Sequence, residues 1–140
     1  MPTNRVDRYR STEVLTDDPV VVVRLLLEES MRTVRTAIEH AEAGRIRERG
    51  RAASKAVELL SALMEDIDTG KSPALGTSLG RLYDYCQHRV IEGHLRGEVR
   101  PFEDALSVLG DITGAWVEVL EREKLCPPVT EQGGVESAWA

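Results

Sequence analysis

Residues 19–27 read Pro19-Val20-Val21-Val22-Val23-Arg24-Leu25-Leu26-Leu27, and seven of the eight residues after the proline are large aliphatics. Acidic and hydroxyl side chains at 16–18 can cap a helix here, and the proline suits its first position, where no backbone N–H is needed. A helix that faces one core buries a stripe of roughly 100° or a little more. This helix carries more apolar surface than that, so another segment, a second subunit or another protein must cover the excess.

The apolar periodicity continues outward from this stretch and predicts four helices. The first ends at Gly44, and the others are expected at about 45–67, 74–95 and 101–124, with breaks at 68–73 and at Gly97. The predicted inward residues are Val20, Val23, Leu27, Ser30, Val34, Ala37 and Ala41 in the first helix, Ile46, Ala53, Ala56, Leu60, Leu63 and Ile67 in the second, Leu75, Leu79, Leu82, Cys86 and Val90 in the third, and Phe102, Leu106, Leu109, Ile112, Trp116 and Leu120 in the fourth.

Long helices with short connections favour an all-α fold, an antiparallel up-down-up-down four-helix bundle. We expect an N-terminal arm at residues 1–16, the bundle at 17–124 and a disordered tail at 125–140, where paired prolines and glycines interrupt the chain. A hydrophobic content of 41% and a charged content of 30% are typical of a soluble globular domain.

Composition also excludes several functions. A net charge of −6 argues against a nucleic-acid partner. No apolar run is long enough to cross a membrane, and the first residues lack the apolar core of a secretory signal. Cys86 and Cys126 follow no metal-binding pattern, so we expect reduced thiols in a cytoplasmic protein.

The sequence indicates no enzyme, metal or cofactor. His40, His88 and His94 lack the glutamate three residues earlier that a di-iron bundle requires. His88 is placed mid-helix, which leaves open a histidine phosphotransfer-type or structural bundle as the alternative function. The basic run from Arg45 to Lys55 is either a solvated helix face or a positive rim that orients an acidic segment of a partner.

The excess apolar surface of the first helix points to protein binding. If Val20, Val23 and Leu27 face the core, the residues between them lie on or beyond its edge. Tyr9, Val14 and Leu15 of the arm could fold over this edge, and an amphipathic helix of another protein could displace them. The alternatives are that the first helix is simply the most buried one, or that the patch dimerises.

Several segments resemble the FliS family of flagellin-specific secretion chaperones. They are Tyr9, residues 13–19 (Glu-Val-Leu-Thr-Asp-Asp-Pro), residues 50–60 after the aliphatic helix, and Ala115-Trp116. The most specific is Leu82-Tyr83-Asp84-Tyr85 followed by Cys86-Gln87-His88-Arg89, where the family typically has Leu-Tyr-Asp-Tyr-Met and basic residues. Leu27-Glu28-Glu29 and Gly93-His94-Leu95 depart from the family pattern.

The resemblance implies a non-enzymatic cytoplasmic chaperone of bacterial flagellum assembly. It would bind the C-terminal helical region of flagellin, prevent premature polymerisation and aid delivery to the flagellar type III secretion system. Components of the export apparatus would be further partners, and the client-free protein would be a monomer or a weak homodimer. By position, Tyr9, Val14 and Leu15 would form a displaceable plug, Val21, Val22, Leu25 and Leu26 would line the client groove, and Tyr83, Tyr85 and Arg89 would be client-binding candidates on the third helix.

Overall fold

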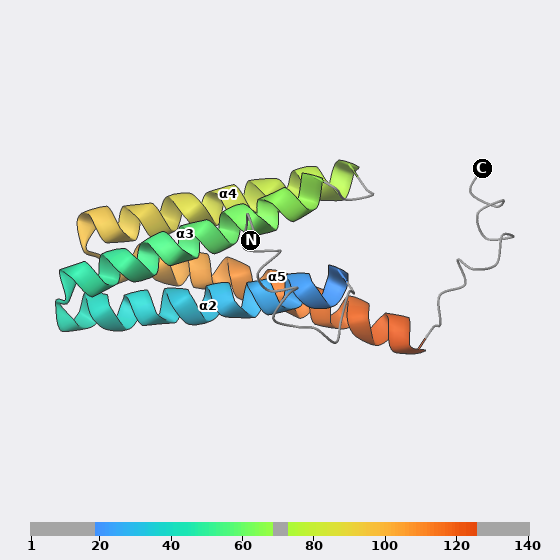
Figure 1. Ribbon diagram of the computed structural model, residues 1–140, viewed down its shortest axis with the longest axis horizontal. Helices are drawn as coiled ribbons and strands as arrows, with labels where there is room; N and C mark the ends of the chain where they lie inside the picture. The colour runs from blue at the N-terminus through green and yellow to red at the C-terminus, as the bar shows by residue number, and fades with distance from the viewer. Residues whose placement is uncertain (1–18, 69–72, 126–140) are drawn as a thin grey trace, which may run out of the picture.

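The computed structural model describes residues 19–68 and 73–125, and side-chain surroundings within 20–67 and 76–118. Four helices occupy these ranges: α2 (Pro19–Ala43), α3 (Ile46–Asp68), α4 (Pro73–Arg96) and α5 (Val99–Leu125) (Figure 1). The four predicted helices are therefore confirmed. The expected arm at 1–16, most of the expected tail at 125–140, and Tyr9, Val14, Leu15 and Cys126 lie outside the described residues.

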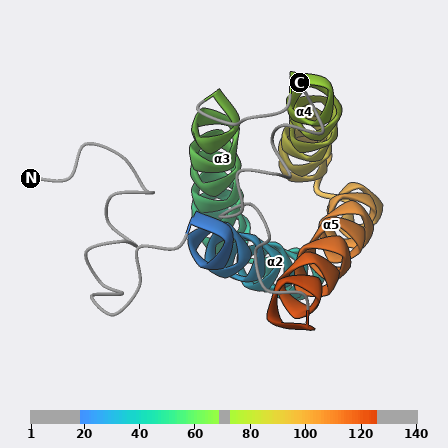
Figure 2. The ribbon, with the colours of Figure 1, turned by 90° about the vertical axis from the view of Figure 1, so that its right-hand side faces the viewer.

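The helices form an antiparallel bundle in which chain neighbours are also spatial neighbours. α2 packs on α3 and α5, and α4 packs on the same two helices. Viewed along the bundle, α2 and α4 occupy diagonal corners (Figure 2). The predicted up-down-up-down four-helix bundle is confirmed. None of the described helices is long and apolar enough to cross a membrane.

Two glycines end helices as the sequence predicts. Gly44 and Gly97 have positive φ angles of 73° and 67°, a conformation that residues with a Cβ rarely adopt. Past each helix, a backbone N–H reaches back to a carbonyl of the last turn: Arg45 to His40 at 2.9 Å, and Glu98 to Gly93 at 3.1 Å. These hydrogen bonds satisfy carbonyl groups that a helix end leaves unpaired.

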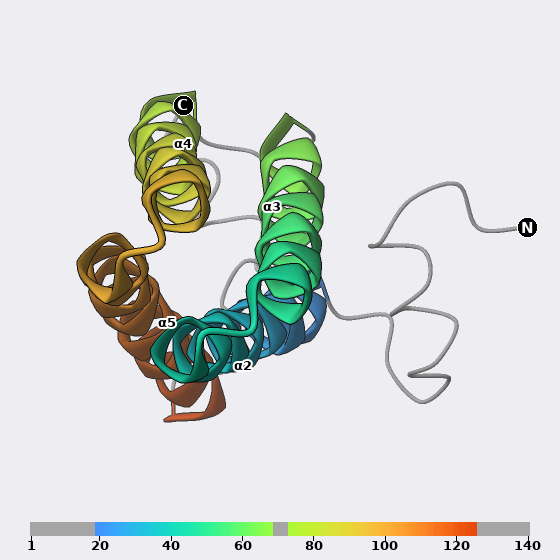
Figure 3. The same cartoon turned by 90° about the vertical axis from the view of Figure 1, so that its left-hand side faces the viewer.

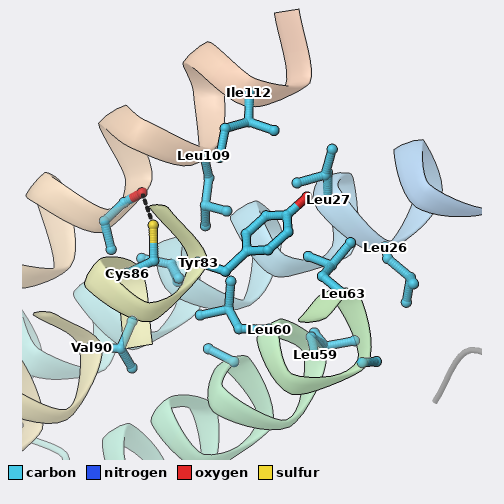
Figure 4. Close-up of a cluster of buried hydrophobic side chains, with 14 of the residues drawn as sticks. Leu26, Leu27, Leu59, Leu60, Leu63, Tyr83, Cys86, Val90, Leu109 and Ile112 are labelled. Carbon is cyan, nitrogen blue, oxygen red and sulfur yellow. Dashed lines mark hydrogen bonds between the residues drawn. The ribbon is translucent and has the colours of Figure 1, made fainter. Parts of the chain in front are cut away.

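The core is built mainly from leucine, valine and alanine around two aromatic rings. Tyr83 of α4 and Phe102 of α5 are fully buried, and Leu27, Leu60, Leu63 and Leu109 surround the Tyr83 ring in Figure 4. Most of the predicted inward positions are buried or half-buried within the described residues. The side chains of Leu75 and Leu120 lie outside them.

The prediction that the side chains of Ile46 and Leu82 face the core is wrong. Both side chains are exposed. Ile46 is the first residue of α3, where the helix reaches the end of the bundle. In α4 the buried large side chains are Tyr83, Cys86 and Val90, so Leu82 falls at the edge of the apolar stripe.

Candidate protein-binding surface

The first two turns of α2 are covered over more than one face. No residue from Val20 to Leu27 is exposed, and Val22, Val23, Leu26 and Leu27 are buried. Val22 and Leu26 are wholly enclosed. A helix that contacts two neighbours buries a wider stripe than one that contacts a single neighbour, and α2 contacts both α3 and α5. Much of the apolar surface at the start of α2 therefore lies in the core of the bundle.

Val21 and Leu25 form a separate apolar pair on the outside of α2. They are four residues apart and so lie on one face. At about 100° per residue, this face points away from the buried stripe around Val23, Leu27 and Ser30. Both side chains are half-buried. With Val20, which is also half-buried, they are the aliphatic residues of the stretch that another chain can contact.

A groove of about 400 Å³ between α2 and α3 begins one turn beyond Leu25. Glu29, four residues after Leu25, lines it and pairs with Lys55 of α3 at 2.8 Å and with Arg32 at 2.8 Å. Partial burial opposes ionisation of Glu29, but the hydrogen bonds from Lys55 and Arg32 outweigh it, and the pKa is lowered. Thr33, Thr36, His40, Glu48, Arg51 and Ala52 complete the lining. The groove is thus lined almost entirely by polar and charged side chains, and Leu25 lies one helical turn before the first of them.

The candidate residues of α4 fall in different environments. Tyr83 is in the core, where burial raises the pKa of its phenol and a hydrogen bond with the Trp116 side chain partly offsets that effect. Tyr85, by contrast, is 43% exposed. Tyr85 and Leu82 are three residues apart in one helix and therefore lie on one side of α4. Arg89, one turn after Tyr85, pairs with Asp104, so this side of α4 lies toward α5.

Arg89 is half-buried and joins α4 to α5. Its guanidinium pairs with Asp104 of α5 at 2.7 Å and with Glu92 of its own helix. The Asp104 hydrogen bond raises the pKa of Arg89, and the same bond lowers the pKa of the Asp104 carboxyl. Because its guanidinium is paired with both carboxylates, the main role of Arg89 is to hold α4 and α5 together.

The candidate residues therefore divide into three groups. Val22, Leu26 and Tyr83 are core residues that shape the bundle from inside. Val21 and Leu25 lie on the outer side of α2, whereas Tyr85 is exposed on α4. These two helices occupy diagonal corners of the bundle (Figure 2). The exposure of Leu82 beside Tyr85 was not predicted from the sequence, because the apolar spacing of α4 is the same whether Leu82 lies inside the buried stripe or at its edge.

The surroundings of His88 are poorly suited to phosphoryl transfer. His88 is exposed, with Nδ1 2.9 Å from the Asp84 carbonyl oxygen and 3.5 Å from its carboxylate. A carboxylate beside the imidazole repels an incoming phosphoryl group. Within the residues that the structure describes, no three His, Cys, Asp or Glu side chains gather as a metal site would require.

Comparison with known proteins identifies the family of the chain. A family model described as flagellar protein FliS matches residues 2–123. The flagellar secretion chaperone FliS of Salmonella typhimurium strain LT2 is 26% identical over 107 residues, which cover 76% of this chain and 79% of the relative. The flagellar secretion chaperone FliSB of Pseudomonas aeruginosa strain PAO1 is 23% identical over 99 residues, covering 71% and 79%. The chain belongs to the FliS family, a family of flagellar secretion chaperones rather than of enzymes.

Proposed function

We propose that this protein binds the C-terminal helical region of flagellin in the cytoplasm, prevents its premature polymerisation and aids its delivery to the flagellar type III secretion system. Membership of a secretion-chaperone family supports a client protein as the partner. The observation that carries the proposal is the outward apolar pair, Val21 and Leu25, which precedes the α2–α3 groove by one to two helical turns.

An amphipathic client helix suits this surface. Its apolar stripe would cover Val21 and Leu25. Because both side chains are already half-buried, the client would add only part of the roughly 1.5–3 kcal/mol that full burial of a large aliphatic side chain contributes. Polar side chains of the client would continue along the charged lining of the groove at Glu29 and Lys55. This is the helix-in-groove mode of peptide recognition.

One such contact is too small for a stable complex. A disordered client must offset its ordering cost, and stable interfaces bury about 1,200–2,000 Å² in total. Tyr85 and Leu82 supply a second apolar surface on the opposite side of the bundle. A client that touches both surfaces must pass around the bundle, and roughly 10 extended residues suffice for a path of about 30 Å.

Within this proposal, Val22, Leu26 and Tyr83 hold the surface in shape from the core, and Arg89 keeps α4 and α5 together beneath Tyr85. Tyr9, Val14 and Leu15 remain the proposed plug of the client-free state. That state is proposed to be a monomer or a weak homodimer, and components of the export apparatus are proposed to receive the loaded chaperone.

Flagellin polymerisation tests the proposal. Purified flagellin, seeded with short filaments and followed by light scattering, should stop growing when the full chain is added at equimolar concentration. Flagellin that lacks its C-terminal region should form no complex by size-exclusion chromatography with light scattering. The charge-reversal variant Arg35→Glu, changed at an exposed position of α2 outside the groove, should inhibit as well as the unchanged chain. Unaltered filament growth, or equal binding of the truncated flagellin, would refute the proposal.

A further inference from the structure

Three exposed apolar side chains lie at the other end of the bundle, where α3 begins and α4 ends. Ile46 is 63%, Ile91 44% and Leu95 77% exposed. The two helix ends are held together by Arg49 of α3, which donates from Nε to His94 Nδ1 at 3.2 Å and from a terminal nitrogen to the His94 carbonyl oxygen at 2.9 Å. Ile46 precedes Arg49 by one turn, and Ile91 and Leu95 flank His94. Figure 3 views the bundle from this end.

A groove of about 570 Å³ is lined by six residues of α3 and by His94 of α4. Ile46 and Leu95 are the sequence neighbours of its lining residues Arg47 and His94. Gly50 and His94 line it together. The imidazole lies against the α3 backbone, because a Cβ on Gly50 would be only 3.0 Å from His94 Cε1. Ile91 and Leu95 are four residues apart, so their side chains share one line along α4.

The rim of this groove is positively charged, although the whole chain has a net charge of −6. Arg47, Arg51 and Lys55 line it, with Glu58 as the one acidic lining residue. Lys55 is engaged with Glu29. Among the described residues, no carboxylate lies within ion-pair distance of Arg47 or Arg51, and both side chains are exposed. The rim therefore favours an acidic ligand.

We propose that this α3–α4 surface (Ile46, Ile91, Leu95, Arg47 and Arg51) is a second docking site, which binds an acidic amphipathic helix of a partner protein other than the client. The apolar line of Ile91 and Leu95 matches the i, i+4 stripe of a helix, and the arginine rim attracts glutamate or aspartate beside that stripe. The site lies at the end of the bundle opposite to the start of α2, where Val21 and Leu25 are placed (Figure 1). A helix bound here leaves Val21 and Leu25 free, although Arg51 and Lys55 line both grooves.

The test uses a fluorescein-labelled designed peptide of about 18 residues, long enough to form helix on binding, with leucines at helical spacing and glutamates beside them. Fluorescence anisotropy with the full chain should show binding that weakens as salt rises from about 50 to 300 mM. Leu95→Asp and Arg47→Glu should each weaken binding at least about tenfold. Arg47 is chosen because Arg51 also lines the α2–α3 groove.

Matched controls are Val117→Asp, an exposed apolar residue of α5, and Arg35→Glu, an exposed cation of α2. Both should bind the peptide as the unchanged chain does, and a peptide with lysines in place of the glutamates should not bind. No binding of the glutamate peptide, equal binding of the lysine peptide, or loss of binding in Leu25→Asp with retention in Leu95→Asp would overturn the proposal. A dimer of the chain that Leu95→Asp dissociates, without peptide binding, would also overturn it.

Discussion

The Trp116 side chain of α5 hydrogen bonds with the Tyr83 hydroxyl of α4. Indole nitrogen is only a donor, so the phenol oxygen accepts. This bond satisfies a hydroxyl group that is buried among leucines (Figure 4). It explains how the tyrosine of the family-like Leu-Tyr-Asp-Tyr segment is accommodated in an apolar core.

The two sides of this bond should differ in their effect on stability. Tyr83→Phe should cost about 1 kcal/mol, the usual net value of one hydrogen bond, because the half-buried Trp116 can turn its N–H toward water. Trp116→Phe should cost more, about 1–3 kcal/mol for the unpaired buried hydroxyl beyond the lost packing. Urea unfolding followed by circular dichroism measures both. A Trp116→Phe variant as stable as Tyr83→Phe would contradict the hydrogen bond.

Two helical glycines should respond in opposite ways to alanine. A Cβ on Gly93 would lie 2.9 Å from ring carbons of the buried Phe102, so Gly93→Ala should lower stability by about 1–3 kcal/mol through overpacking. A Cβ on Gly114 would meet nothing within 4 Å, and Gly114→Ala should raise stability by about 0.5–1 kcal/mol. Thermal unfolding of the two variants compares them directly. Equal effects would show that α4 and α5 do not approach closely at Phe102.

The Cys86 thiol should be unreactive toward alkylating reagents in the folded protein. Burial raises the pKa of its thiol to about 12, and Sγ lies 3.7 Å from the Ala105 carbonyl oxygen. In a Cys126→Ser background, iodoacetamide at pH 8 should modify it at least about 100-fold more slowly than in urea, because thiolate and access both require opening. Rapid modification of the folded chain would place this thiol outside the core.

The same thiol makes stability depend on pH. Its folded pKa lies above the ordinary value of 9.0, so the unfolded chain loses this proton first. The protonated Cys86 thiol therefore makes its full contribution to the free energy of unfolding below about pH 9, and this contribution is lost as the pH rises toward 12. Cys86→Ala should remove this part of the alkaline decline in the urea midpoint, whatever its own cost in packing. An unchanged decline would assign it to other groups.

Most of the fold could be predicted from local chemistry. Pro19, Gly44 and Gly97 mark helix ends because their backbone preferences act without tertiary contacts. Periodicity also located Ser30 on the buried side, where its hydroxyl donates to the Leu26 carbonyl oxygen at 2.8 Å. These features depend on a residue and its own helix, and one sequence is enough to reveal them.

The binding surface could be predicted only in part. Periodicity gives the direction of a side chain but not the number of helices packed around it. For this reason the sequence placed Val22 and Leu26 at a groove, whereas in the structure they are core residues. Arg49 shows the same limit. It belongs to a basic run expected on the surface, yet it is buried against the end of α4, a contact that only the tertiary structure creates.

The proposed client surface depends on Val21 and Leu25 lying outside the core, and one titration decides whether the client uses them. A flagellin C-terminal fragment is titrated by isothermal calorimetry into the unchanged chain, into Leu25→Asp and into the control Arg35→Glu. Leu25→Asp should lose at least about tenfold in affinity, because a carboxylate would be desolvated against the client, while its circular dichroism spectrum and thermal midpoint stay close to those of the unchanged chain. Full affinity in a folded Leu25→Asp, or its unfolding, would rule out this surface as the client site.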